Sequence, residues 1–302
     1  MRALVTGSSG FAGRHLVAHL ESCGDDVSGL DRADGIDITD ASALGRHLES
    51  VRPEVVYHLA GWADVGGSWD DPLATFEANA LGTLHLLTAA RTSGVRRVLV
   101  VGSADVYGKV GETDLPLTEA QPLAPVSPYA ASKVTAEYLA IQAWNGHGLE
   151  TVRTRSFNHI GPGQSNRFVA AAIAERVARA EHDLRDEVEV GNVTPRRDFT
   201  DVRDVARAYR ALMVDGRAGE VYHVCSGRDL AIRELADILL GMAERPMTLS
   251  IDPALQRPVD IPVLRGDPSK LRSDTSWEPQ ISIEDTLAEL LAEARTRTES
   301  GA

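Results

Sequence analysis

The sequence has few cysteines that could form disulfides and no long apolar run that could anchor it in a membrane. Its two cysteines, Cys23 and Cys225, lie far apart and outside any CxxC spacing. We therefore expect two reduced, buried thiols in a cytoplasmic protein, with a disulfide as the less favoured alternative. Apolar runs such as 98–101 are far shorter than the roughly 20 residues of a membrane helix. The N-terminus enters a glycine turn without a secretory or transit segment, so no membrane association is expected.

Positive charge is also scarce. The chain has 31 Lys and Arg against 44 Asp and Glu, which gives a formal net charge of −13. Such a surface repels nucleic-acid backbones and anionic membranes, so neither is an expected partner. A small phosphate-bearing ligand remains compatible, because it needs only a local cluster of donors. With 43% apolar residues over 302 positions, the sequence predicts one large globular domain with a dependent lobe, or two domains.

Short β-rich runs alternate with helical stretches through the first half of the chain. Strands are expected at 2–5, 27–30, 54–59, 97–101 and 150–155, and helices at 11–24, 41–51, 73–93 and 128–144. Strands that are apolar on both sides indicate a parallel sheet with helices on both faces. After about Phe157 the rhythm breaks at the glycines and proline of 161–163. A long helix is expected from near Phe168 and a closing helix from Ile283.

Glycines at 7, 10 and 13 lie directly between the first expected strand and the first expected helix. A tight turn needs a residue that tolerates positive φ, and a pyrophosphate needs a close backbone approach. The helix N-terminus adds free N–H groups and the positive end of a dipole. A plain strand–helix turn is the less favoured alternative, because the context on both sides suits a dinucleotide.

Asp31 closes the second expected strand, where the adenosine ribose of a dinucleotide would lie. A carboxylate there accepts hydrogen bonds from the ribose diol and repels a 2′-phosphate, which favours NAD over NADP. Arg32 follows at once and could pair with that phosphate, so NADP stays possible. The segment 37–40 resembles an acidic pair that meets the adenine of a dinucleotide. For Asp40, a role as the cap of a helix that begins at Ala41 is an equally good explanation.

Tyr129 and Lys133 stand at i and i+4, so on a helix they share one face. Ionising a free tyrosine at pH 7 costs about 4 kcal/mol, and a neighbouring ammonium or a positive nicotinamide ring would offset much of that cost. As a phenol, the same group can protonate an alkoxide that forms when hydride arrives. Ser103 ends the fourth strand, where its hydroxyl could bind the reacting carbonyl oxygen; a simple strand-end cap is the alternative.

Four segments together carry a family resemblance that covers essentially the whole chain: HLA at 58–60, SADVYG at 103–108, SPYAASK at 127–133 and RRDF at 196–199. The chain resembles the extended short-chain dehydrogenases/reductases of the nucleotide-sugar epimerase/dehydratase group. Within it, FNHIGPGQ at 157–164 and the segments 257–260 and 265–270 are most similar to GDP-4-keto-6-deoxy-D-mannose reductases and, next, to GDP-mannose 4,6-dehydratases.

The resemblance implies an α/β fold with a Rossmann-like, doubly wound parallel sheet and a smaller C-terminal substrate-binding lobe. The dinucleotide-binding domain would take residues 1–160 with a returning segment near 196–226, and the lobe would take 161–195 and 227–302. The implied cofactor is NAD, with NADP possible. Its expected contacts are Gly7, Ser9, Gly10, Phe11, Ala12, Gly13, Asp31, Arg32, Asp37, Ile38, Leu59, Ala60, Gly61, Val101, Tyr129, Lys133 and Phe157.

The resemblance also implies a substrate site without a metal. Ser103, Tyr129, Lys133 and Asp105 would be catalytic, and Ser103 and Asp105 would also touch the sugar. The other expected contacts are Asn158, Arg197 and Arg257 at the diphosphate, Asp260 at the ribose, and Phe168 and Val169 at the base. Arginine suits this task because it binds phosphate oxygens in a bidentate way. A structural ion pair with Asp198 or Asp201 is the alternative for Arg197, and a solvated loop charge for Arg257. A homodimer through the helices at 73–93 and 128–144 is also implied.

Ser103, Tyr129 and Lys133 serve reductases, dehydratases and epimerases alike. Dehydration also needs a base at C5 and an acid at C6, and the related dehydratases carry Glu in place of Asp105 and Thr in place of Ser103. Aspartate is one methylene shorter, and a displacement near 1 Å can cost about 10²-fold in rate. Ala104 supplies no acid.

We therefore predict NAD(P)H-dependent reduction at C4 of a nucleotide-linked 4-keto-6-deoxyhexose, with GDP-4-keto-6-deoxy-D-mannose reduced to GDP-D-rhamnose. The alternatives are a GDP-mannose 4,6-dehydratase, another nucleotide-sugar 4-epimerase or dehydratase and, least favoured, a non-catalytic NAD-binding sensor.

Overall fold

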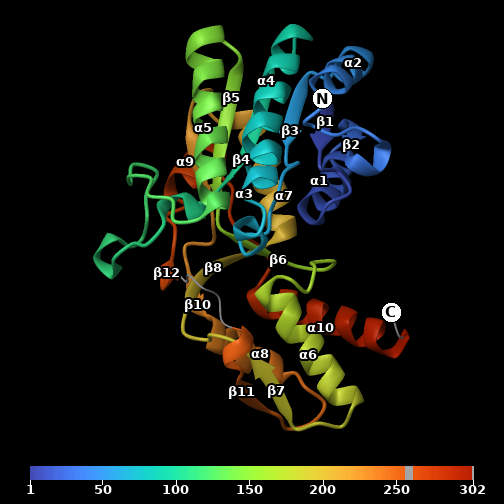
Figure 1. The fold of residues 1–302 in the computed structure, drawn as a ribbon, viewed down its shortest axis with the longest axis vertical. Coiled ribbons are helices and arrows are strands. Elements are labelled where there is room, and N and C mark those ends of the chain that lie inside the picture. Colours follow the sequence, from blue (N-terminus) through green and yellow to red (C-terminus); the bar gives the residue numbers. More distant parts are fainter. Residues whose placement is uncertain (256–260, 301–302) are drawn as a thin grey trace.

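A six-stranded parallel sheet organises the first half of the chain, in a computed structural model that describes residues 1–255 and 261–300 (Figure 1). Its order is β2-β1-β3-β4-β5-β9, with bounds β1 Arg2–Thr6, β2 Asp26–Leu30, β3 Val55–His58, β4 Arg97–Ser103, β5 Glu150–Ser156 and β9 Val221–Val224. This is the doubly wound α/β fold that the sequence predicts. The chain changes direction across the sheet between β1 and β3, so a ligand crevice is expected beyond their carboxyl ends.

Helices cover both faces of this sheet. One face carries α1 (Phe11–Ser22), α7 (Val202–Asp215) and α9 (Ser269–Thr275), and the other carries α2 (Ala41–Val51), α4 (Gly82–Thr92) and α5 (Pro128–His147). Successive residues of β1 serve opposite cores, because Val5 packs in the cluster with α1 and α7, whereas Leu4 packs in the cluster with α2 and α4. Both side chains are fully buried, which explains the uninterrupted apolar strand sequences.

Two expectations for this half are corrected. The helix predicted at 73–93 is interrupted: α3 (Pro72–Phe76) runs into a π-helical turn at Glu77–Leu81 before α4 begins. The prediction that both thiols are reduced is confirmed, because both cysteines are free. The prediction that both are buried holds for Cys225 but is wrong for Cys23, which is exposed. Cys23 caps the C-terminal end of α1 at the surface.

The second half of the chain builds a smaller lobe with its own core, in the lower part of Figure 1. Its strands are β6 Asn158–Ile160, β7 Glu187–Val190, β8 Arg196–Asp201, β10 Asp229–Ala231, β11 Thr248–Ile251 and β12 Val263–Leu264. β8 pairs with β6, β10 and β12, while β7 pairs with β11. Helices α6 (Val169–His182), α8 (Ile232–Gly241) and α10 (Ile283–Ser300) pack together, and many alanines in α6 allow their close approach.

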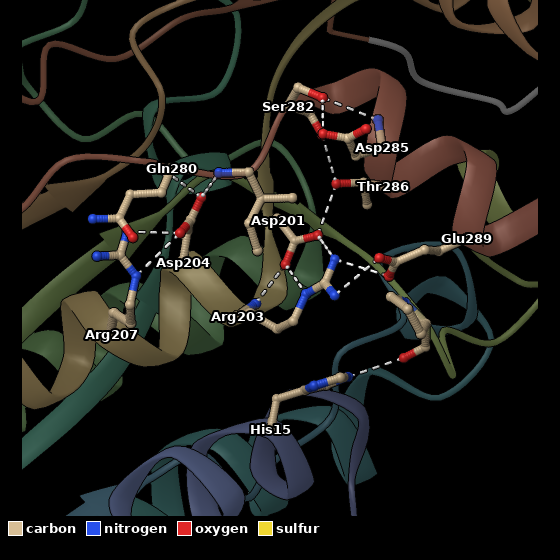
Figure 2. Close-up of polar contacts among 12 residues, drawn as sticks. His15, Asp201, Arg203, Asp204, Arg207, Gln280, Ser282, Asp285, Thr286 and Glu289 are labelled. Atoms are coloured by element: carbon tan, nitrogen blue, oxygen red, sulfur yellow. Dashed lines mark hydrogen bonds and ion pairs between the residues drawn. The ribbon is translucent and has the colours of Figure 1, made fainter. Parts of the chain in front are cut away.

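Polar contacts join this lobe to the sheet domain. Figure 2 shows Arg203 of α7 between two carboxylates, with Asp201 at 2.8 Å and Glu289 of α10 at 2.9 Å. Thr286 of α10 donates a 2.7 Å hydrogen bond to Asp201, and His15 of α1 lies 2.9 Å from the Pro162 carbonyl oxygen. The helix that opens after the glycine turn is thus tied to the entry of the lobe. The exact domain boundaries predicted above remain a prediction.

Among the described residues, no helix combines the length and the apolar character that a bilayer crossing requires.

Candidate active site

The glycine turn after β1 has the geometry of a backbone cradle. Gly7 adopts a φ of +72°, and a side chain there would meet the Ala60 nitrogen at 2.9 Å. A Cβ on Gly13 would collide with the Gly7 carbonyl oxygen, so this helix residue must also be glycine. No described side chain caps α1, and Gly10 is its N-cap. The N–H groups of the first helical turn are therefore left for an anion.

The Asp31 carboxylate closes β2 beside this turn. It accepts hydrogen bonds from the backbone nitrogens of Ser9 at 3.3 Å and Ala33 at 3.4 Å. Burial alone would raise the pKa of Asp31, but these hydrogen bonds outweigh it and lower the pKa below the ordinary value. Asp31 therefore carries a full negative charge at neutral pH, next to the exposed Arg32.

The neighbouring segment 37–40 shows a mixture of roles. The pKa of Asp37 is lowered because its carboxylate accepts hydrogen bonds from the backbone and the hydroxyl of Thr39, both at 2.8 Å. Ile38 is buried, and its side chain lies against Gly82. Asp40 caps α2 through the nitrogens of Ser42 and Ala43, which confirms the capping alternative.

A buried polar chain fixes the loop after β3 beside the glycine turn. The Thr6 hydroxyl accepts from the Ala60 nitrogen at 3.1 Å and contacts His58 Nδ1 at 2.8 Å, and His58 Nε2 lies 3.0 Å from the Thr83 hydroxyl. Burial, and then the charge of Lys133, lower the pKa of His58 to about 3, so the ring is neutral. These hydrogen bonds hold the loop with the predicted contacts Leu59, Ala60 and Gly61 at the crevice between β1 and β3.

The predicted catalytic side chains gather where β4 meets α5. Ser103 ends β4, and its hydroxyl accepts a 3.2 Å hydrogen bond from the Asp105 nitrogen. The same hydroxyl lies near the Tyr129 phenol and lowers the pKa of that phenol in part. Lys133 Nζ lies 5.9 Å from the centroid of the Tyr129 ring and donates to the Val101 carbonyl at 3.1 Å. One hydroxyl, one phenol and one ammonium therefore face a common space beyond the sheet.

The protonation of Tyr129 differs from the prediction. Burial, and next the charge of Asp105, raise the pKa of Tyr129 well above its ordinary value, and the Ser103 hydroxyl lowers it only in part. Lys133 does not reverse this, although it is still largely protonated at neutral pH after burial has lowered the pKa of its ammonium to about 8. The expectation of a phenol made acidic by Lys133 is wrong for the protein alone, because desolvation of the phenolate outweighs an ammonium 5.9 Å from the ring.

Asn79 is a site residue that sequence reasoning missed. The π-helical turn presents its side chain to the loop after β3, where Oδ1 accepts from the Trp62 nitrogen at 2.8 Å. Its Nδ2 donates to the Ser132 hydroxyl at 2.9 Å, and Ser132 donates to the Tyr129 carbonyl at 2.7 Å. A helical period of 3.6 residues cannot reveal this, because the extra residue in the turn rotates Asn79 off the predicted face.

A second polar group lies at the start of the lobe, around Tyr209, which sequence reasoning missed. The Tyr209 hydroxyl contacts Ser156 Oγ at 2.8 Å and His159 Nε2 at 3.3 Å. Burial lowers the pKa of His159 to about 4, so this imidazole is neutral. Phe157 is buried just before this group and packs edge-on against His223.

The expected substrate contacts are only partly placed. Asn158 is exposed in β6, and Phe168 and Val169 are half-buried where α6 begins. Arg197 lies in β8, and its Nη1 donates to the Arg196 carbonyl at 2.9 Å. Arg257 and Asp260 fall outside the described residues.

The carboxylates offered as alternative partners of Arg197 have other contacts of their own. Asp201 pairs with Arg203, and Asp198 accepts hydrogen bonds from the nitrogens of Ser226 at 2.8 Å and Gly227 at 2.9 Å. Within residues 1–255 and 261–300, no group of His, Cys, Asp and Glu is arranged to hold a metal ion.

Known proteins resemble this chain over nearly its whole length. Residues 35–290 match the family model described as GDP-mannose 4,6 dehydratase. The chain is 40% identical to GDP-6-deoxy-D-mannose reductase of Pseudomonas aeruginosa, over 99% of each chain. It is 27% identical to GDP-mannose 4,6-dehydratase of Yersinia enterocolitica, over 96% of this chain and 93% of that protein.

Solved structures agree. RMD from Pseudomonas aeruginosa in complex with NADPH superposes with a TM-score of 0.90 at 38% identity, and the match covers 98% of both chains. The UDP-glucose 4-epimerase of Thermotoga maritima with UDP-glucose gives a TM-score of 0.88 at 26% identity, covering 99% of this chain and 100% of that one.

Proposed function

Because the chain belongs to the GDP-mannose 4,6-dehydratase family of extended short-chain dehydrogenases/reductases, we propose that it reduces a 4-keto nucleotide sugar. The substrate is GDP-4-keto-6-deoxy-D-mannose, the reductant is NAD(P)H, and the product is GDP-D-rhamnose. Similarity over the whole chain to a GDP-6-deoxy-D-mannose reductase, at 40% identity, favours this reaction over that of the 27% identical dehydratase.

The observation that carries the proposal is the similarity over the whole chain to a GDP-6-deoxy-D-mannose reductase, and the phenol at the site suits that reaction. Tyr129 is buried and lies near the charge of Asp105, and both raise its pKa, which keeps the proton on the oxygen at neutral pH. A reductase needs a proton donor when its catalytic cycle begins, because reduction creates an alkoxide at C4.

The residues present fit a dinucleotide. The glycine cradle at Gly7 and Gly13 leaves no room for side chains, the first turn of α1 supplies free N–H groups, and Asp31 lies where an adenosine ribose would be bound. When bound, NAD(P)H supplies the hydride for C4. A charged Asp31 repels a 2′-phosphate, so we expect NADH to be preferred, although the related Pseudomonas aeruginosa reductase was solved with NADPH.

Three side chains divide the work on the sugar. The Ser103 hydroxyl donates a hydrogen bond to the carbonyl oxygen and orients C4, and the Tyr129 hydroxyl delivers its proton to the same oxygen. The ammonium of Lys133, 5.9 Å from the centroid of the Tyr129 ring, stabilises the phenolate that remains after the proton has left. We assign Arg197 and Asn158 to the diphosphate and Phe168 and Val169 to the base, as the family resemblance implies.

A 4,6-dehydratase is the second candidate, because the matching family model is described by that activity. Two features oppose it. The dehydratases that the sequence resembles carry a glutamate where this chain has Asp105, and the shorter side chain displaces the base needed at C5. Ala104 offers no acid at C6.

We also propose that two copies pair through the outer faces of α3, α4 and α5. Large apolar side chains are exposed there, including Leu73, Phe76, Leu84 and Tyr138. Figure 1 shows α4 and α5 side by side. A protein that consumes NAD(P)H and a nucleotide sugar is expected to act in the cytoplasm, where both are made.

Absorbance at 340 nm tests the reaction. Purified protein with NADH is mixed with either GDP-4-keto-6-deoxy-D-mannose or GDP-mannose. The proposal predicts a loss of absorbance equal to the keto sugar added, and no loss with GDP-mannose. Conversion of GDP-mannose without net consumption of reduced cofactor would identify a dehydratase instead.

A further inference from the structure

We propose that Arg155 is a positioning residue that holds the two catalytic elements of the site against each other. It joins the element that begins at Ser103 to the helix that carries Tyr129, through contacts with Tyr107 and Glu137. The inference rests on the proposed function, since it concerns how the carbonyl-binding hydroxyl and the proton donor reach one oxygen atom.

The first half of the connection is a buried ion pair on α5. Arg155 lies in β5, and its Nε and Nη2 donate to the two carboxylate oxygens of Glu137 at 3.0 and 2.7 Å. Glu137 stands one turn beyond Lys133 and two turns beyond Tyr129. Because the pairing is bidentate, it restrains both the rotation and the axial position of the helix face that carries these residues.

The second half reaches the turn that follows β4. Nη1 of the same guanidinium donates to the Tyr107 hydroxyl at 2.7 Å and to the Glu119 carbonyl oxygen at 3.0 Å. Tyr107 ends the 3-10 helix Ala104–Tyr107, which is capped at its other end by Ser103 and contains Asp105. A shift in the position of Tyr107 therefore moves the Ser103 hydroxyl, because a single helical turn joins the two residues.

Burial makes these contacts specific. Glu137, Tyr107 and Arg155 are all at least nine-tenths buried, so water cannot replace a lost partner. His223, which also contacts the Tyr107 hydroxyl, is neutral, because burial and the Arg155 charge lower its pKa to about 3. The guanidinium is thus the cation shared by both elements.

The reaction gives this connection its importance. The Ser103 hydroxyl lies close enough to the Tyr129 phenol to lower the pKa of that phenol, and both groups must reach the carbonyl oxygen at C4. A misplacement of about 1 Å between reacting groups can cost about 10²-fold in rate. Loss of the connection should therefore lower kcat and leave cofactor binding at the distant glycine turn unchanged.

The test compares two tyrosine hydroxyls. Tyr107→Phe removes one hydroxyl but leaves Arg155 bonded to Glu137 and Glu119, so the fold is retained. Tyr222→Phe is the control, because that buried tyrosine also has a hydroxyl with a charged partner, Asp274 at 2.7 Å, and it accepts from the Arg217 nitrogen at 2.9 Å. The Tyr107 hydroxyl contacts Arg155, His223 and the Thr118 carbonyl oxygen. Both variants should lose a similar amount of melting temperature.

We expect Tyr107→Phe to lower kcat by about 10-fold with KM for NADH within twofold, and Tyr222→Phe to leave kcat unchanged. Arg155→Lys keeps the positive charge but cannot donate to Glu137 and Tyr107 from separate nitrogens, so it should lower kcat further. Equal kcat in Tyr107→Phe and Tyr222→Phe would overturn the proposal.

A readout without turnover separates the two claims. Crystal structures of wild type and Tyr107→Phe give the distance between Ser103 Oγ and Tyr129 Oη, which we expect to lengthen in the variant. An inactive wild type would refute the proposed function, and this distance would still decide the positioning role: an unchanged distance overturns it.

Discussion

Lys133→Met should make the cofactor-free protein more stable while abolishing its turnover. Burial lowers the pKa of Lys133 from 10.5 to about 8, so the folded protein holds this ammonium at an energetic cost. At 1.36 kcal/mol per pKa unit, that cost is about 3 kcal/mol below pH 8. It is an upper limit, because the side chain keeps partial contact with solvent. The variant also loses the hydrogen bond to the Val101 carbonyl, which destabilises it by about 1.5 kcal/mol.

The net gain at pH 7 is therefore about 1–2 kcal/mol, or a rise in melting temperature of about 2–4 °C. The pH dependence has a definite sign. Between about pH 8 and 10.5 the unfolded chain binds the Lys133 proton more strongly than the folded protein, so wild-type stability gains from this group as pH rises. The advantage of Lys133→Met should be complete below pH 8 and should fade towards pH 10.5.

Thermal unfolding of both proteins without cofactor, at pH 7 and pH 10.5, measures this difference. Lys270→Met is the control, because that ammonium is paired with Glu220 at 2.7 Å and its removal should not stabilise the protein. A melting temperature of Lys133→Met below that of wild type at pH 7, by as much as in the control, would refute the desolvation argument.

Three further predictions concern the proton donor, the cofactor and the assembly. Tyr129→Phe should lower kcat by about 10²–10⁴-fold and retain NADH binding measured by fluorescence titration; retained turnover would contradict the role of the phenol. Asp31→Ser should shift the ratio of NADPH to NADH dissociation constants towards NADPH by about 10-fold, and an unchanged ratio would remove Asp31 as the determinant. Light scattering should give wild type twice the chain mass of 32.5 kDa and Leu84→Glu a single chain mass, whereas a monomeric wild type would rule out the pairing.

The sheet domain was largely readable from the sequence, because its signals are local. Strands buried on both faces leave apolar runs, and the collision of a Cβ at Gly13 with the Gly7 carbonyl forces glycines at fixed spacing. Tyr129 and Lys133 were found for the same reason, since a helix places i and i+4 on one face.

The parts that were missed depend on tertiary contacts. The π-helical turn at Glu77–Leu81 adds a residue to an otherwise helical pattern, and the sequence around it looks like one continuous helix. The pKa of Tyr129 depends on how deeply the phenol is buried and on how close Asp105 comes, and neither can be read from spacing. Arg155 joins segments far apart in the chain and looks like an ordinary strand residue until they are packed together.

Transfer of deuterium tests the central claim most directly. The protein is incubated with GDP-4-keto-6-deoxy-D-mannose and NADH in which both hydrogens at C4 of the nicotinamide are deuterium, and the product sugar is analysed by NMR and mass spectrometry. Our account predicts a GDP-6-deoxyhexose with one deuterium at C4. A product without deuterium at that carbon would contradict it.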